Sequence, residues 1–197
     1  MKKTFLNLIF ALIFTVSYSQ GEYKNKALKV GIESIDEFRE FLSIPNDANY
    51  KDEMEPLINW GIEKFKYFDF EVKRLETDGL PLLLASKIVS EESKTLLIYL
   101  QFDGQPVDNS KWNQEDPYKA ELKTLRNGKY EKTDWRILDK LTSNNINEED
   151  IRIFARSASD AKGPIMMILN AFKIMKQNNL SLNYNLKIIM DFEEEKS

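Results

Sequence analysis

Hydrophobic residues recur at two different spacings along this chain, and each spacing predicts a different kind of element. In the first part, apolar residues follow the period of amphipathic helices, which predicts helices at residues 34–44 and 53–67. Farther along, the period shortens to two, which predicts strands at residues 70–75, 82–89 and 95–102. The last of these strands is apolar on both faces, a pattern typical of a central strand that is covered on two sides.

The C-terminal part of the chain has the pattern of a β-α-β unit. Strands are predicted at residues 151–155 and 186–192, with a strongly apolar helix at residues 164–177 between them. A right-handed parallel crossover is the default for such a unit. Residues 107–150 show no regular period, and we expect a loop that is functional or wraps over the surface. The fold class predicted from these elements is α/β, a mostly parallel sheet with helices on both faces.

The N-terminus has the features of a secretory signal peptide at residues 1–19. Lys2 and Lys3 precede an apolar run at residues 5–16, and small residues follow it. The alternative is an uncleaved membrane anchor, but a spanning helix needs about twenty apolar residues and this run is shorter. We therefore expect an exported protein, periplasmic or extracellular, whose folded part is residues 20–197.

The amino-acid composition is informative mainly because two residue types are absent from it. The chain has no cysteine, which excludes disulfides and cysteine-based zinc sites, and no histidine, the commonest catalytic base and transition-metal ligand. Hydrolytic or metal chemistry must therefore use carboxylates, or a histidine from outside this chain. The formal net charge is −4 and the sequence has no run of basic residues, so we expect neither nucleic acid nor an anionic membrane as a partner.

Acidic residues come directly after three of the predicted strands. They are Asp103, Asp160 and the pair Glu194 and Glu195. Because the carboxyl ends of parallel strands meet at one edge of a sheet, we expect Asp160, Glu194 and Glu195 to converge there. Carboxylates that hold two divalent cations, with one more acting as a base, can hydrolyse an amide bond. Taken singly, each of these acids also has a structural interpretation, as a turn residue, a helix N-cap or part of a solvated tail.

Residues 97–108, residues 154–164 and the glutamates at 193–195 together carry a family resemblance. The element Arg-Ser-Ala-Ser-Asp-Ala-Lys-Gly at residues 156–163 is the most specific of them. In order and spacing, these segments resemble the co-catalytic zinc peptidases related to carnosine dipeptidase, succinyl-diaminopimelate desuccinylase and aminoacylase. The resemblance covers residues 30–197.

The resemblance implies a role for each acidic position. Asp160 would bridge two metal ions, Glu195 would bind one of them, and Glu194 would be the general base that activates water. Asp103 would orient the first metal-binding side chain, which is a histidine in the family and is Gln101 in this chain. An amide oxygen is a weak ligand for zinc, so we expect one metal to bind loosely or to be another cation.

The implied function is hydrolysis of a dipeptide or an N-acyl amino acid by metal-activated water, with two zinc ions in the complete enzyme. Similar proteins continue for a comparable length, with further ligands and a lid domain that often mediates dimerisation. We therefore interpret residues 20–197 as the N-terminal part of an incomplete zinc-peptidase catalytic domain, inactive by itself and able to oligomerise only through the missing lid. Two alternatives stay open, a secreted non-catalytic ligand-binding protein and the product of an interrupted gene.

Overall fold

The computed structural model describes residues 23–141 and 150–196, and the predicted signal peptide lies outside them. Within this described part, every helix is too short or too polar to span a membrane. Residues 23–33 are helical. The helices that follow are α2 (Ile35–Ser43), α3 (Glu55–Tyr67) and α4 (Lys162–Gln177). The strands are β1 (Glu71–Leu75), β2 (Leu82–Lys87), β3 (Thr95–Gln101), β4 (Glu121–Arg126), β5 (Lys129–Lys132), β6 (Ile151–Phe154) and β7 (Asn185–Asp191).

Four strands form the larger sheet, in the order β1-β2-β7-β3. β1 pairs with β2, and β2 with β7, in antiparallel fashion, while β3 and β7 are parallel. The α/β class is thus confirmed, but the prediction of a mostly parallel sheet is wrong for the described residues. The physical reason is the short turn between β1 and β2, which can join only antiparallel neighbours.

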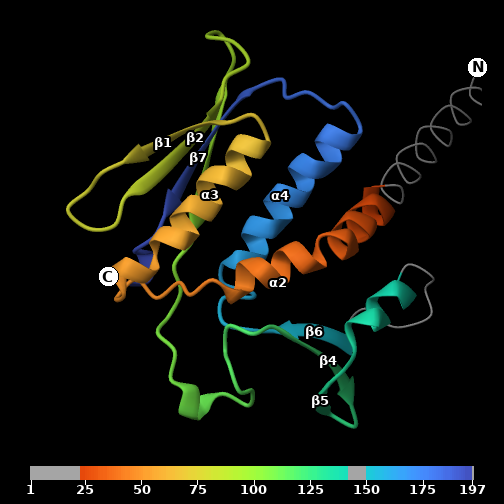
Figure 1. Ribbon diagram of the computed structural model, residues 1–197. Helices are drawn as coiled ribbons and strands as arrows, with labels where there is room; N and C mark the ends of the chain where they lie inside the picture. The colour runs from red at the N-terminus through yellow and green to blue at the C-terminus, as the bar shows by residue number, and fades with distance from the viewer. Residues whose placement is uncertain (1–22, 142–149, 197) are drawn as a thin grey trace, which may run out of the picture.

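The second sheet is antiparallel throughout, with the order β5-β4-β6. It includes residues 121–132 of the predicted loop at residues 107–150, and the turn between β4 and β5 is Asn127-Gly128, where both residues have positive φ angles. Because β6 pairs with β4 rather than with β7, the predicted parallel crossover is wrong. Helix α4 instead leads from one sheet to the other (Figure 1).

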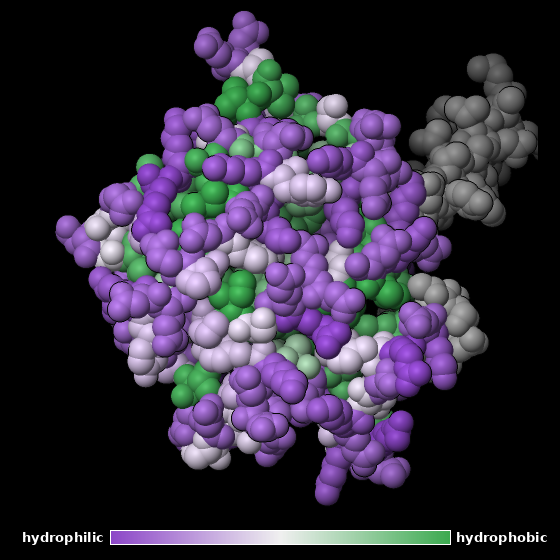
Figure 2. Space-filling view, viewed as in Figure 1, coloured by the Kyte–Doolittle hydropathy of each residue, from purple (hydrophilic) through white to green (hydrophobic). Residues whose placement is uncertain are grey.

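Helices α3 and α4 cover one face of the larger sheet (Figure 1). The alternation along β7 buries Leu186, Ile188 and Met190 against these helices, as the sequence predicts. Each fully buried aliphatic side chain of this kind contributes about 1.5–3 kcal/mol to stability. Two rings join α2 to α3, since Phe41 stacks on Trp60 with centroids 3.7 Å apart. On the side drawn in Figure 2, hydrophilic residues predominate over the helices.

The opposite face of the larger sheet is open along β3. Leu97 is 57% exposed and Tyr99 is 54% exposed, although both belong to the strand predicted to be central. In the described residues β3 is instead an edge strand, with β7 as its neighbour. The prediction of helices on both faces is therefore wrong for this part of the chain, because α3 and α4 pack on the same side.

Candidate active site at the edge formed by β3 and β7

The candidate site begins where the two parallel strands end together. Gln101 is the register partner of Asp191, and the amide of Phe102 donates to the carbonyl oxygen of Asp191 over 2.7 Å. Parallel pairing sends the segments after both strands out from the same edge. The polar residues after Gln101 and the glutamates after Asp191 are therefore neighbours in space.

Glu195 is the centre of a hydrogen-bonded cluster at this edge. Gln101 Nε2 donates to Glu195 Oε1 over 2.9 Å, and Gln105 Nε2 donates to Glu195 Oε2. The backbone amide of Glu195 donates to Asp103 Oδ2 over 2.9 Å. The structure thus brings together three of the predicted site residues, Gln101, Asp103 and Glu195, and adds Gln105, which sequence reasoning missed.

Asp103 is the buried acid of this cluster. Its side chain is fully buried, and its Oδ1 atom has no hydrogen-bond partner among the described residues. Burial raises the pKa of this carboxyl to about 6, while backbone hydrogen bonds from Glu195 and Glu194 lower it. A buried oxygen without a donor is costly, so this atom fits a cation or a donor from outside the described residues.

Asp160 lies on the turn that follows β6. Its side chain is exposed, and the turn is attached to the β3 edge through Asn46. Asn46 Nδ2 donates to Ser157 Oγ and to the carbonyl oxygen of Phe102, each over 3.0 Å. The amide of Gly104 donates to the Asn46 carbonyl oxygen over 2.8 Å. Asn46 therefore holds the turn of Asp160 against the segment that contains Asp103.

This contact between the two segments requires a glycine at position 104. A Cβ atom there would lie 2.2 Å from Ser157 Oγ and 2.9 Å from Asn46 Nδ2, which is closer than real Cβ atoms approach. Only glycine allows the two segments to meet. The Asp-Gly sequence at positions 103 and 104 looks like an ordinary turn, so nothing in the sequence signals this close approach.

The expected convergence of Asp160, Glu194 and Glu195 is not observed as a ready metal site. In residues 23–141 and 150–196, no three acidic side chains form a group that could hold a metal ion. The reason is the second sheet: β6 is not a neighbour of β7, so the turn of Asp160 does not leave from the β3 and β7 edge. The roles of these three residues stay predictions.

The three consecutive glutamates after β7 have different surroundings. Glu193 Oε2 accepts a hydrogen bond from the amide of Leu80 over 2.6 Å, and its Oε1 lies 3.2 Å from Lys196 Nζ. Glu193 is therefore structural, whereas Glu195 contacts the end of β3. Glu194 is exposed at the start of a short 3-10 helix, η5 (Glu194–Lys196).

Lys162 fastens the start of α4 beside the turn of Asp160. Its side chain is fully buried, and Nζ donates to the carbonyl oxygens of Phe41 over 3.0 Å and Ile44 over 2.5 Å. Burial lowers the pKa of this amine to about 7. Lysine is rarely buried, so its position two residues after Asp160 gives no sign of this structural role in the sequence.

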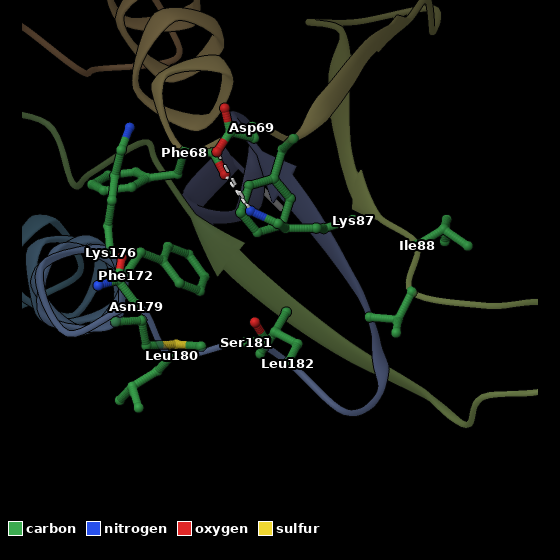
Figure 3. Close-up of a pocket in the computed structure, with 13 residues that line it drawn as sticks. Phe68, Asp69, Lys87, Ile88, Phe172, Lys176, Asn179, Leu180, Ser181 and Leu182 are labelled. Atoms are coloured by element: carbon green, nitrogen blue, oxygen red, sulfur yellow. Dashed lines mark hydrogen bonds and ion pairs between the residues drawn. The ribbon is translucent and has the colours of Figure 1, made fainter.

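The cavity drawn in Figure 3 is separate from the candidate site. It has a volume of about 500 Å³ and is lined by residues that include Ile88, Phe172 and Leu182. Leu182 precedes β7, whereas Glu195 follows it, and the seven residues of β7 span about 20 Å. We therefore place the candidate chemistry at the carboxyl end of β7 and not in this cavity.

The ligands available at the candidate site are oxygen atoms. Carboxylate and amide oxygens are the ligands that hard divalent cations prefer. Zinc enzymes, by contrast, typically have sites rich in imidazole. The unpartnered oxygen of Asp103 and the carboxylate of Glu195 fit a cation of this kind. The acidic edge formed by β3 and β7 is therefore the candidate cation site of this α/β fold.

The chain belongs to peptidase family M20/M25/M40, because the model of that family matches residues 97–197. The resemblance found in the sequence is thereby confirmed. A comparison with curated protein sequences gave no match. The structural comparisons agree with the family, and they show the extent of the shared fold.

Human carnosine dipeptidase 1 is similar in fold, with a TM-score of 0.64 and 19% identity over 88% of this chain and 35% of that one. The M20 family metallo-carboxypeptidase Sso-CP2 from Sulfolobus solfataricus has a TM-score of 0.60 and 28% identity over 83% and 31% of the two chains. The dipeptidase Dug1p from Saccharomyces cerevisiae has a TM-score of 0.60 and 17% identity over 86% and 34%. The chain thus spans about a third of the length of these structures.

Proposed function

We propose that this chain forms part of the catalytic domain of a metal-dependent hydrolase that cleaves the amide bond of a dipeptide or an N-acyl amino acid. The observation that carries the proposal is the cluster in which Glu195 contacts both Gln101 and Asp103. Membership of a peptidase family supports the hydrolase class. The dipeptidases among the similar structures support a small peptide as substrate.

Each predicted site residue has a distinct task in this proposal. Asp160 and Glu195 hold divalent cations, two zinc ions in the complete enzyme, and Gln101 is a weaker amide ligand. A bound cation polarises the scissile carbonyl and makes water more acidic. Asp103, predicted to orient Gln101, accepts the hydrogen bond from the Glu195 backbone amide and in this proposal positions Glu195. Glu194, exposed beside this cluster, accepts a proton from the attacking water and returns it to the leaving amine.

The cation site requires ligands beyond those that the described residues supply. No group of three acids able to hold a metal ion is present in that part of the chain. Tight catalytic metal sites use three protein ligands or more. We therefore propose weak cation binding and no turnover by this chain alone, and we propose export on the basis of the basic and apolar N-terminal sequence.

The test combines cation binding with hydrolysis. The purified protein is titrated with Mn²⁺, Co²⁺ and Zn²⁺ by calorimetry, and each mixture is then assayed against a panel of dipeptides and N-acetyl amino acids. We expect micromolar cation binding that weakens in Glu195→Gln and persists in Glu194→Gln. Turnover that survives Glu194→Gln would contradict the base assignment. A protein that binds none of the three cations would overturn the hydrolase proposal.

A second candidate function is a non-catalytic peptide-binding protein. It is favoured by Gln101, which stands where the family has a metal-binding histidine and uses its amide nitrogen to contact Glu195. The two functions separate in metal-free buffer. Dipeptide binding without any cation supports the binding protein, and cation-dependent binding supports the hydrolase.

A further inference from the structure

The cavity drawn in Figure 3 lies at the amino end of β7, opposite the end that carries the candidate site, and we call it the apolar cavity. Its walls come from four segments that are far apart in the sequence: residues 68–70, 87–89, 172–176 and 179–182. The hollow is therefore a product of the fold and not of one loop. Its volume of about 500 Å³ is within the range of small-molecule sites.

Three phenylalanine rings line this cavity. The ring centroid of Phe172 lies 5.2 Å from that of Phe70 and 5.8 Å from that of Phe68, in tilted arrangements. Phe68 and Phe70 are buried in the core, so the rings are held in place. Tilted and offset contacts of this kind are the ones that aromatic rings prefer. The cavity therefore offers a fixed aromatic wall to another planar ring.

Aliphatic side chains of the cavity are exposed, although their backbone is held firmly. Ile88 is 55% exposed and Val89 is 49% exposed. The side chain of buried Asn185 accepts hydrogen bonds from the amides of Val89 and Ser90 over 2.7 and 3.2 Å, and it donates to the Ser90 carbonyl oxygen over 2.8 Å. Exposed apolar groups that are already ordered lose little conformational freedom on binding, so this wall is suited to a ligand.

The end of α4 supplies both apolar and polar groups to the cavity. The amide of Leu180 donates to the carbonyl oxygen of Met175 over 2.9 Å, and Asn179 has a φ of 52°, which is the usual geometry of a helix C-terminus. This turn places Leu180 in the cavity wall between Asn179 and Ser181. Both of these polar side chains are exposed and uncharged, and each can donate or accept a hydrogen bond.

The two lysines of the cavity are already engaged by the protein (Figure 3). Lys87 Nζ donates to the carbonyl oxygen of Phe68 over 2.8 Å and lies 3.8 Å from the carboxylate of Asp69. Lys176 Nζ donates to the carbonyl oxygen of Tyr67 over 3.1 Å and lies 4.3 Å from the centroid of its ring. An anionic ligand would have to displace these contacts and would meet the charge of Asp69. The cavity therefore favours an uncharged ligand.

We propose that the apolar cavity binds a small uncharged molecule that has a planar aromatic ring and one neutral polar group, such as a hydroxyl. The ring packs against the phenylalanines, and the polar group contacts Asn179 or Ser181. The seven residues of β7 separate this cavity from Glu195. The proposal therefore stands independently of the proposed hydrolase function.

The test uses three probes in metal-free buffer at neutral pH: 2-naphthol, 2-naphthoate and cyclohexanol. Calorimetry measures their binding to the purified protein. We expect 2-naphthol to bind roughly ten-fold or more tightly than the other two, because 2-naphthoate must give up the hydration of its carboxylate and cyclohexanol has no planar ring. Equal or tighter binding of 2-naphthoate or cyclohexanol, or no binding of 2-naphthol, overturns the proposal.

Substitutions of exposed residues locate the site. Ile88→Glu and Leu180→Glu each place a charge in the cavity wall and should weaken 2-naphthol binding roughly ten-fold or more. Leu125→Glu is the matched control, because Leu125 is also exposed but lies on β4 of the second sheet. The two cavity variants are in different segments, so one still tests binding where the other disturbs folding. Equal affinities in the cavity variants and Leu125→Glu overturn the assignment to this cavity.

The polar contact has its own test. Asn179→Gly removes the side-chain amide and keeps the turn, because glycine adopts a positive φ freely. Combined with Ser181→Ala, it should weaken 2-naphthol binding roughly three-fold or more, with thermal unfolding as the check that the fold is retained. An unchanged affinity in this double variant overturns the polar part of the proposal.

Discussion

The backbone amide of Glu195 donates a hydrogen bond to Oδ2 of Asp103 over 2.9 Å, although the two residues are 92 positions apart in the sequence. The contact exists because β3 and β7 are parallel neighbours that end at the same edge. It fixes the orientation of the glutamate run, so that Glu193 faces the turn at Leu80 while Glu195 faces Gln101. The neighbouring glutamates of this run therefore have different contacts.

The different surroundings of Glu193 and Glu195 predict different effects of the same substitution. Glu195→Gln should weaken Mn²⁺ binding by roughly ten-fold or more, because it removes a charged carboxylate from the proposed cation site at the β3 edge. Glu193→Gln should leave the affinity within about two-fold, since Glu193 binds the Leu80 amide and Lys196. Calorimetric titration of both variants measures this. Equal losses in the two would show that the glutamates act only through net charge.

Gly104→Ala should lower the free energy of unfolding by roughly 1–3 kcal/mol, because the added methyl group meets Ser157 Oγ in a packed region. Gly31→Ala is the matched control, since a Cβ there has no neighbour within 4 Å and alanine favours helix. Urea unfolding measures both. Ser157 has a φ of 60°, a conformation that glycine adopts freely. The double variant Gly104→Ala with Ser157→Gly should therefore recover stability, and a double variant no better than the single one would refute the steric account.

Glu121 predicts a dependence of stability on pH. Its pKa is lowered in the folded protein, chiefly by the hydrogen bond from Lys132, so the charged form is favoured by folding. This contribution is present above the ordinary pKa of a glutamate and is lost as the pH falls through the lowered value. At pH 7, Glu121→Gln should reduce the free energy of unfolding by roughly 1 kcal/mol.

The difference between wild type and Glu121→Gln should shrink as the pH is lowered from 5 to 3. Thermal unfolding across this range measures it. Glu131→Gln is the control, because Glu131 lies 4.0 Å from Arg126 in a pair that is largely exposed. A difference that stays constant with pH would mean that Glu121 acts through packing and not through its charge.

The strands and helices with strong apolar patterns could be predicted from the sequence, including β3, β7, α3 and α4. β5 could not, because all four of its residues are exposed and no apolar alternation marks them. The signal that could have identified it is Asn127-Gly128, a typical hairpin turn. Because this hairpin was not predicted, no neighbouring strand other than β7 could be assigned to β6. The default right-handed parallel crossover therefore assigned β6 to the wrong sheet.

Part of the candidate site could be predicted because it depends on strand direction alone. The sequence predicts that acids after the strands lie at one edge of a mostly parallel sheet, and the observed parallel pairing of β3 and β7 brings Asp103 to Glu195 at such an edge. The position of Asp160 depends instead on which sheet holds β6, and that is decided by contacts distant in the sequence. The turn of Asp160 is joined to the β3 edge by Asn46 and to the end of α2 by Lys162. Both side chains donate to backbone carbonyl groups, and such contacts leave no pattern in the sequence.

The exposed side of the edge strand β3, called its flank below, has a practical consequence for work with this protein. Leu97 and Tyr99 present apolar surface to water beside a row of backbone amide and carbonyl groups on which another strand could assemble. Concentrated solutions should therefore form reversible clusters through this flank. Leu97→Lys should raise the highest protein concentration at which the sample is still monodisperse by light scattering. The reason is that a charged side chain on an edge strand disfavours pairing with a strand of another molecule.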